Sequence, residues 1–338
     1  MPSAAIYDCE GARLSKEERA FFRDADPWGF ILFARHCESA DAVRAHCAAL
    51  RETVGRDAPI LIDQEGGRVV RLKPPAFPAH PPMAVFGKLW KLDPKKARAA
   101  ARLNAFLLAR MVRSLGVTVN CAPMLDVPQS DSDPVVIGDR VLATHVDQIS
   151  ALGRDVIDGL IEGGALPVIK HLPGHGRALC DSHHELPRVT ASKEDLRAVD
   201  FKPFAALKDA PIGMTAHILY DAYDKERVST LSPIVIEEAI RGEIGFDGLL
   251  LSDDLKMKAL AGPLAGRSRA ALEAGCDIAL CCNYTLAEKI AAAKETRALE
   301  GKAAARAAAA LARLTAPGGP DVESDYKRLA ALLVPALA

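Results

Sequence analysis

Short apolar stretches of strand length alternate along the chain with longer amphipathic stretches. The strand-like stretches are residues 29–33, 59–62, 117–122, 167–169, 212–216, 249–251 and 278–281. Strands that alternate with helices form a parallel sheet, and seven or so such units are enough to close the sheet on itself. The pattern therefore predicts an α/β fold, a single (β/α)8 TIM-like barrel in a regular or irregular form.

The longer stretches are typical of helices. Residues 94–115 place apolar side chains on one helical face, and Gly116 ends the pattern. The alanine-rich stretch 286–315 predicts an outer or terminal helix, and the leucines after it predict a last helix that docks on the rest. No Pro/Ser-rich linker divides the 338 residues, so we expect one barrel domain over 1–338, with the helices of 286–338 packed on the barrel.

Charge narrows the choice of partners. The chain has 43 Lys and Arg against 44 Asp and Glu, interspersed along the sequence, and a formal net charge of −1. This balance gives neither the basic surface of a nucleic-acid-binding protein nor a polybasic membrane patch. We therefore expect a small-molecule partner, no nucleic acid and no membrane. We also expect a monomer, although the charge does not bear on the oligomeric state.

The N-terminal sequence and the cysteines indicate the cellular compartment of the protein. The first 19 residues lack the basic and then apolar pattern of a secretory signal, and no stretch reaches the roughly 18 unbroken apolar residues of a membrane span. Eight cysteines occur without CxxC spacing, several of them inside apolar stretches. These features predict a cytoplasmic protein with buried, reduced thiols.

Polar side chains follow the predicted strands. In chain order they are Arg35-His36, the run Asp63 to Arg68 with Arg71, Asp126, Lys170-His171, His217 and Asp253-Asp254. The carboxyl ends of barrel strands meet at one rim, which is where barrel enzymes hold their reactive groups. We therefore expect these side chains to form one site.

Some of these clusters also have structural interpretations. Gly66-Gly67, just after Asp63, suggests the close backbone approach of a ligand, although loop solvation is the alternative. One carboxylate of Asp253-Asp254 can cap a helix at 255–259 while the other points inward. His217 fits a packed, hydrogen-bonded histidine better than a catalytic one.

Residues 170–184 concentrate the most chemistry, with Lys-His-Leu-Pro-Gly-His-Gly at 170–176 followed by Asp181. The loop could hold a metal, and the rival hypothesis is a metal-dependent hydrolase with the ligands His171, His175, Asp181, His183 and His184. The H-x-x-x-H spacing aligns two ligands only on a helix, however, and the proline and glycine at 173–174 prevent a helix there.

Three segments resemble the hallmarks of the β-N-acetylhexosaminidases of glycoside hydrolase family three. They are residues 62–69 (Ile-Asp-Gln-Glu-Gly-Gly-Arg-Val), residues 170–176 with Asp181-Ser-His183, and residues 251–255 (Leu-Ser-Asp-Asp-Leu). Residues 29–35 and 136–140 extend the resemblance over roughly residues 5–285. The short single-domain form is similar to Gram-negative cytoplasmic enzymes that recycle cell-wall muropeptides.

The resemblance implies a role for each matching residue. Asp253 matches the covalent nucleophile, His183 the general acid/base, and Asp181 the carboxylate that pairs with it. The sugar-binding residues match Asp63, Arg71, Arg140, Lys170 and His171. Leu172 and the segment 139–142 depart from the usual family sequence, which leaves the fine shape of the pocket open.

The resemblance thus implies a single catalytic domain, a retaining exo-β-N-acetylglucosaminidase. Its amino-sugar substrate would be terminal β-linked GlcNAc on muropeptides of the GlcNAc-anhydroMurNAc type, hydrolysed without metal or cofactor. A non-catalytic sugar-binding protein would keep Asp63 and Arg71 but would not need Asp253 opposite a histidine loop.

Overall fold

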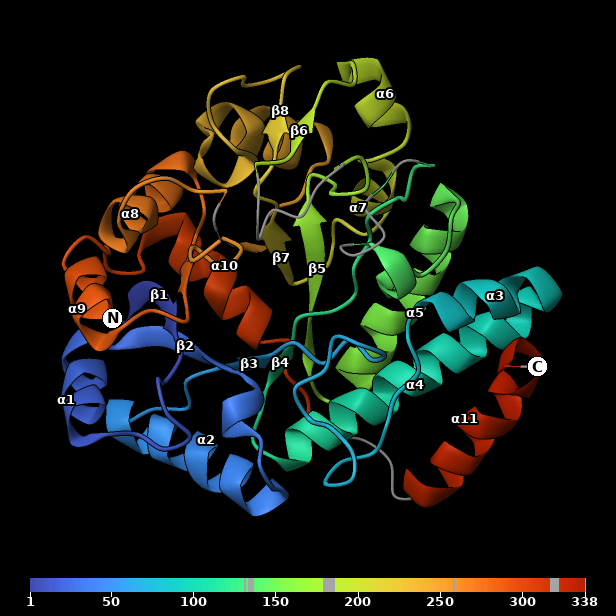
Figure 1. Cartoon of the computed structure of the whole chain (residues 1–338), viewed down its shortest axis with the longest axis horizontal. Coiled ribbons are helices and arrows are strands. Elements are labelled where there is room, and N and C mark those ends of the chain that lie inside the picture. Colours follow the sequence, from blue (N-terminus) through green and yellow to red (C-terminus); the bar gives the residue numbers. More distant parts are fainter. Residues whose placement is uncertain (131, 133–136, 179–185, 258, 317–321, 338) are drawn as a thin grey trace.

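The computed structural model describes residues 1–130, 132, 137–178, 186–257, 259–316 and 322–337 (Figure 1). Eight parallel strands form its central sheet, in the order β10-β1-β2-β3-β4-β5-β7-β9. A parallel bridge between Leu251 and Ile278 joins the last strand back to the first, which closes the sheet into a barrel. The predicted (β/α)8 TIM-like barrel is confirmed.

The barrel strands are β1 (Ser3–Tyr7), β2 (Pro27–Leu32), β3 (Ile60–Ile62), β4 (Val119–Asn120), β5 (Leu166–Leu172), β7 (Ile212–Thr215), β9 (Leu249–Leu251) and β10 (Ala279–Cys281). Seven of them overlap the seven predicted strands. The sequence pattern missed β1, because its two alanines weaken the apolar signal. It also missed a short parallel pair outside the barrel, β6 (Arg188–Val189) and β8 (Leu219–Tyr220).

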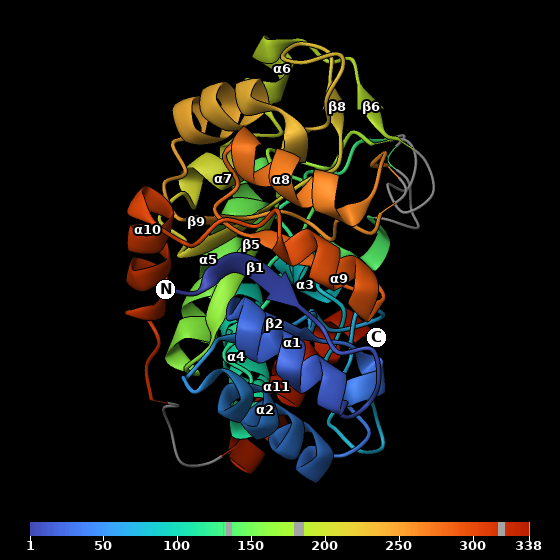
Figure 2. The same cartoon turned by 90° about the vertical axis from the view of Figure 1, so that its left-hand side faces the viewer.

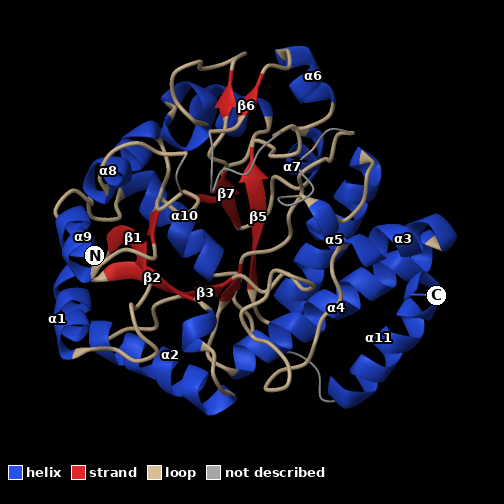
Figure 3. Ribbon diagram, in the orientation of Figure 1, coloured by secondary structure: helices blue, strands red, loops and turns tan. Residues whose placement is uncertain are grey.

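Helices surround the strands on the outside of the barrel (Figure 3). Those that follow the eight barrel strands in turn are α1 (Lys16–Ala25), α2 (Ala40–Val54), α4 (Pro94–Ser114), α5 (Val146–Glu162), α7 (Lys202–Ala206), the π-type helix η4 (Val235–Glu243), α8 (Leu264–Ala274) and α9 (Leu286–Ala293). The helix predicted over 94–115 is α4, which ends one residue early. Within the described ranges, none of the helices is both long and apolar enough to cross a membrane.

Further helices complete the outer layer (Figure 2). They are α3 (Ala84–Leu92), α6 (Lys193–Ala198), α10 (Gly301–Leu311) and α11 (Val322–Leu337), with short 3-10 turns η1 (Ala34–His36), η2 (Gly138–Arg140) and η3 (Ser229–Leu231). The last helix, α11, lies along α3 and α4, and it buries Leu329 and Leu333 (Figure 1). Of the C-terminal leucines expected to dock, Leu329 and Leu333 do so, whereas Leu337 is 68 % exposed.

The single helix predicted over 286–315 is wrong, because α9 and α10 are separate. Between them the backbone is extended and pairs with the N-terminal strand: the Ala4 amide donates to the Arg297 carbonyl at 2.9 Å, and the Leu299 amide donates to the Pro2 carbonyl at 2.8 Å. Strand pairing satisfies these backbone groups and overrides the helix propensity of the alanines.

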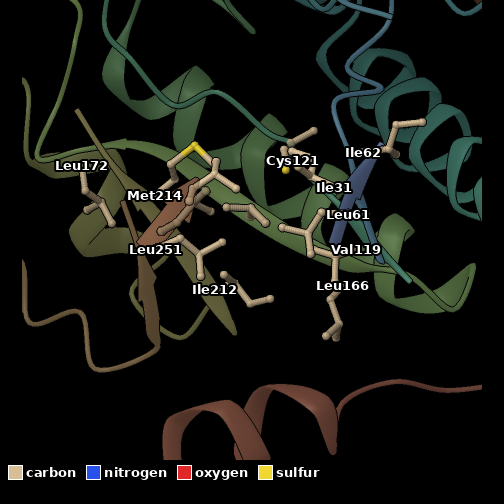
Figure 4. Close-up of a cluster of buried hydrophobic side chains, with 14 of the residues drawn as sticks. Ile31, Leu61, Ile62, Val119, Cys121, Leu166, Leu172, Ile212, Met214 and Leu251 are labelled. Carbon is tan, nitrogen blue, oxygen red and sulfur yellow. The ribbon is translucent and has the colours of Figure 1, made fainter. Parts of the chain in front are cut away.

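The core lies inside the barrel, between strands that are buried on both faces. The labelled side chains of Figure 4 are Ile31, Leu61, Ile62, Val119, Cys121, Leu166, Leu172, Ile212, Met214 and Leu251, and none is more than 3 % exposed. Burial on both faces explains why these strands appear in the sequence as continuous apolar runs rather than alternating ones. Because the middle of the barrel is filled by apolar side chains, its polar side chains collect at the ends of the strands.

Candidate active site

A cavity of about 550 Å³ opens at the carboxyl ends of the barrel strands. Six of the eight site residues named from the sequence line it: Asp63, Arg71, Arg140, Lys170, His171 and Asp253. The other two, Asp181 and His183, lie outside the described residues, and so does His184 of the metal hypothesis. The structure thus brings together six side chains that are as much as 190 positions apart in the sequence.

Arg35 and His36 do not join this cavity, contrary to the expectation of one site for all the strand ends. Arg35 pairs with the buried Asp8, and His36 bonds the Cys9 carbonyl at 3.0 Å. Their place beside the cavity is taken by Phe33, which lines it. The chain turns after β2, so that these two polar residues point toward β1 rather than into the barrel mouth.

The two glycines after Asp63 allow another segment of the protein's own backbone to pack closely against them. Gly66 has a φ of +106°, and a Cβ atom there would lie 2.3 Å from the Pro81 carbonyl oxygen. A Cβ atom on Gly67 would lie 2.6 Å from Pro82. The close backbone approach predicted at this turn is real, but the segment at 80–82 makes it rather than a ligand.

A buried ion network forms the floor of the cavity. The Lys170 ammonium lies 3.0 Å from Asp63 Oδ1 and 2.7 Å from Glu65 Oε1, and its side chain is 3 % exposed. Arg71 donates to the second oxygen of Asp63 at 3.0 Å. Arg140 donates two hydrogen bonds to Glu65, at 3.0 and 2.8 Å. Three cations therefore surround two carboxylates.

The network keeps its members charged. Burial opposes ionisation of Asp63 and Glu65, but the charges of Lys170 and Arg71 outweigh it for Asp63, and those of Arg140 and Lys170 outweigh it for Glu65, so both pKa values are lowered. Burial likewise opposes the charge on Lys170, yet the two carboxylates raise its pKa. The cluster thus offers fixed donors and acceptors, the arrangement that suits sugar hydroxyls.

His171 is oriented by a buried carboxylate. Its Nδ1 atom lies 2.8 Å from Asp126 Oδ2, while Asp126 Oδ1 accepts the backbone amides of His171 and His175 at 3.2 and 2.6 Å. Burial, with the neighbouring His171, lowers the pKa of His175 to about 4, so this ring is neutral. Among the described residues no group of three or more His, Cys, Asp or Glu is placed to hold a metal.

Asp253 and Asp254 differ although they are neighbours. Burial opposes the charge on Asp253, but His171, His217 and the Asp254 amide, which donates to Asp253 Oδ1 at 2.7 Å, lower its pKa. Burial raises the pKa of Asp254 to about 6, and the charge of Asp253 adds to this rise. Asp253 is therefore ionised near neutral pH, as a nucleophile must be.

Asp254 also caps the following turn, because its Oδ1 accepts the Lys256 amide at 2.9 Å. The prediction that one carboxylate caps a helix while the other points inward is correct only in part: Asp254 caps a turn, both carboxylates line the cavity, and the described part of 255–259 forms turns rather than a helix. His217 is fully buried, and both of its ring nitrogens have hydrogen-bond partners, which confirms the packed histidine.

Sequence reasoning missed several residues that line the cavity. They include Ile31, Met214, Lys256, Met257, Leu280, Cys282 and Asn283. Asn283 donates to Asp254 Oδ2 at 3.2 Å and accepts from Arg35 at 3.1 Å. The rule that polar groups follow barrel strands could have found it, because Asn283 comes just after β10. The apolar residues carried no signal that separates them from the core.

We expect that removing the Lys170 charge weakens the fold in a pH-dependent way. Lys170→Met leaves Asp63 and Glu65 buried without their shared cation, which should lower the free energy of unfolding by about 3 kcal/mol at pH 7. A lowered folded-state pKa contributes stability above the unfolded pKa of about 4, and that stability is lost as the pH falls. The deficit should therefore shrink below about pH 4.

Urea unfolding of both proteins between pH 3 and 8 measures this difference. Lys327→Met is the matched control, because Lys327 and its partner Glu323 are 76 % and 81 % exposed. A Lys170→Met deficit equal to that of the control at every pH would show that the buried network contributes nothing.

Comparisons with known proteins identify the family of the chain. The family model "Glycosyl hydrolase family 3 N terminal domain" matches residues 5–316. A β-hexosaminidase of Alkalilimnicola ehrlichii is 39% identical over 279 residues, which cover 81% of this chain and 79% of that protein.

Solved structures are similar over the full length. NagZ from Neisseria gonorrhoeae in complex with N-trifluoroacetyl-D-glucosamine matches with a TM-score of 0.86 and 28% identity, over 99% of this chain and 98% of that one. The same protein in complex with zinc ion matches with a TM-score of 0.85 and 26% identity, over 100% and 98%. With the family model spanning nearly the whole barrel, the chain belongs to glycoside hydrolase family three and is a glycoside hydrolase.

Proposed function

We propose that the protein is a retaining exo-β-N-acetylglucosaminidase with Asp253 as its covalent nucleophile. The observation that carries the proposal is an ionised carboxylate at the end of β9, in one cavity with the charged donors and acceptors around Lys170. A retaining glycosidase needs such a carboxylate below the anomeric carbon and fixed groups that hold the sugar ring. The relative named β-hexosaminidase and the neighbour that holds an N-acyl glucosamine support the choice of sugar.

The reaction has two steps. In the first, Asp253 attacks C1 of the sugar, the bond from C1 to the leaving oxygen breaks, and His183 gives its proton to that oxygen. In the second, His183 takes a proton from water, the water oxygen attacks C1, and Asp253 leaves as a carboxylate. Two inversions at C1 retain the β configuration, and Asp181 orients and stabilises the His183 ring.

The other candidates for the acid differ in their surroundings. Glu65 is held ionised by Lys170 and Arg140, so it has no proton to give near neutral pH. His217 has both ring nitrogens engaged in hydrogen bonds. Asp254 lines the cavity with a pKa raised to about 6, which makes it the best alternative proton donor if His183 does not serve.

The substrate we propose is a muropeptide with terminal GlcNAc β-linked to anhydroMurNAc. Because Arg71, Arg140 and Lys170 are all paired with carboxylates, they suit the hydroxyls of the neutral GlcNAc ring rather than a separate anion. The compartment we propose is the cytoplasm. Seven of the eight cysteines lie in the described residues, and all seven are buried and free, as in a reducing compartment.

Replacing the nucleophile should remove turnover without unfolding the protein. For Asp253→Asn we expect kcat to fall on the order of 10⁴-fold or more, measured with an aryl N-acetylglucosaminide. Asp247→Asn is the matched control, because Asp247 is 84 % exposed and pairs with Arg306 far from the cavity. Proton NMR of early product from the parent protein should show the β anomer, and an α-configured first product would exclude the retaining mechanism.

The loss in His183→Ala should depend on the leaving group. A sugar alkoxide needs a proton as it leaves, so hydrolysis of a natural disaccharide should fall ~10²–10⁴-fold, whereas a nitrophenolate leaves almost unaided. With the aryl substrate the second step then limits turnover, so a burst of phenolate and partial rescue by azide should appear. Asp181→Asn should show the same substrate-dependent loss of activity to a smaller extent. Equal losses on both substrates would move the acid role to another group, with Asp254 tested next.

The metal hypothesis is tested separately, since two structural neighbours were solved with zinc. In the proposed mechanism the proton chemistry belongs to Asp181 and His183, so extended dialysis against a chelator should leave kcat/KM unchanged. Metal analysis of the dialysed protein verifies the removal. A loss of activity that zinc restores would favour the metal-dependent hydrolase instead.

A further inference from the structure

A closed set of hydrogen bonds lies behind the Asp253 carboxylate. The Asp253 amide donates to Thr215 Oγ1 at 3.3 Å, and Thr215 Oγ1 lies 2.7 Å from Thr230 Oγ1. Thr230 Oγ1 lies 2.7 Å from His217 Nδ1, and His217 Nε2 lies 2.9 Å from the Asp254 carbonyl oxygen. Thr215, Thr230 and His217 are each 0 % exposed. This chain of hydrogen bonds thus starts at Asp253 and ends at the next residue, Asp254.

With a neutral His217 ring, the chemistry of the two ends allows one consistent direction for these bonds. A carbonyl oxygen only accepts, so His217 Nε2 carries a hydrogen and donates to Asp254. In the neutral ring Nδ1 is then an acceptor, and the Thr230 hydroxyl donates to it. At the other end the Asp253 amide only donates, so Thr215 accepts there and gives its own hydrogen to Thr230.

The other hydrogen-bonding groups around Thr215 and Thr230 are compatible with these bond directions. Thr230 Oγ1 also lies 2.9 Å from the Ala216 carbonyl, but the Ser229 hydroxyl is 2.9 Å from the same oxygen and can satisfy it. The Cys276 thiol, which contacts Thr215, stays protonated because burial raises its pKa to about 12. Each hydroxyl in the set therefore donates once and accepts once.

These hydrogen bonds hold the Asp253 carboxylate in one orientation. Asp254 is held at its carbonyl by His217, and its amide donates to Asp253 Oδ1 at 2.7 Å. Among the described residues, no hydrogen bond is made to the other oxygen of Asp253, Oδ2. One oxygen of the carboxylate is thus held by the backbone, in a side chain that lines the cavity. A displacement of about 1 Å in such a group can cost about 10²-fold in rate.

We infer that Thr215, Thr230 and His217 are positioning residues for the nucleophile. They fix the main chain of Asp253 and Asp254 at the end of β9 against the end of β7, so that Oδ2 points at the reacting carbon. The inference rests on the proposed function, in which Asp253 attacks the sugar. It assigns a role to the buried His217 that is neither proton transfer nor simple packing.

The test is an isosteric substitution with a conservative rescue. Thr215→Val keeps the shape but removes the acceptor of the Asp253 amide and the donor to Thr230, whereas Thr215→Ser keeps the hydroxyl. With an aryl N-acetylglucosaminide we expect kcat of Thr215→Val to fall about 10²-fold with KM changed less than about threefold. Thr215→Ser should stay within about threefold of the parent.

Thr118→Val is the matched control, because the buried Thr118 hydroxyl accepts the Ile60 amide at 2.9 Å, at the start of β3 and away from the cavity. It loses a comparable buried hydrogen bond, so its melting temperature should fall about as far as that of Thr215→Val while its kcat is unchanged. His217→Gln, which retains a donor near the Asp254 carbonyl, should recover part of the activity that His217→Leu loses.

The two hypotheses fail in different ways. If Asp253→Asn is inactive but Thr215→Val has the kcat of Thr118→Val, the positioning role is excluded and the nucleophile stands. If Asp253→Asn remains active, the proposed function fails first. An equal loss of kcat in Thr215→Val and Thr215→Ser would also exclude the hydrogen-bond role, because the serine hydroxyl can still make the bonds.

Discussion

The site depends on the burial of one ammonium group, that of Lys170, between Asp63 and Glu65. Burying any one of these charges without a partner would cost free energy, because the charge would lose its hydration. Each group is kept ionised by the opposite charges beside it. Arg71 and Arg140 complete the arrangement from two further segments. The network therefore ties the ends of β3 and β5 and the turn η2 together, and it holds them in one geometry before a ligand arrives.

The barrel makes this concentration of charge possible. Its strands are apolar on both faces, so the interior is filled by side chains such as Leu61 and Ile212, and polar groups collect where the strands end (Figure 4). The same architecture places Asp126 behind His171, and it places Thr215 and His217 behind Asp253 and Asp254. His171 and Asp253, which face the cavity, thus each have buried partners that orient them.

Asp253 and Asp254 show how environment divides two identical side chains. The first accepts an amide and lies near two imidazoles, so its pKa is lowered, while the second is desolvated beside that charge and its pKa is raised to about 6. The environments of the two side chains therefore move their pKa values in opposite directions in the same cavity. Their separate hydrogen-bond partners, Thr215 and His217, are parts of one connected set.

The barrel, seven of its eight strands and five of the residues that meet in the cavity could be predicted from the sequence, because apolar periodicity and polar strand ends are local signals. A sixth cavity residue, Arg140, was named only through the family resemblance. It could not show that 297–299 pairs with β1, that Gly66 fits against Pro81, or that Arg35 turns to Asp8. Those outcomes depend on segments far apart in the chain. The fold was needed to show which charges are paired and which carboxylate has a raised pKa, because a pKa is set by burial and by neighbours that the sequence does not place.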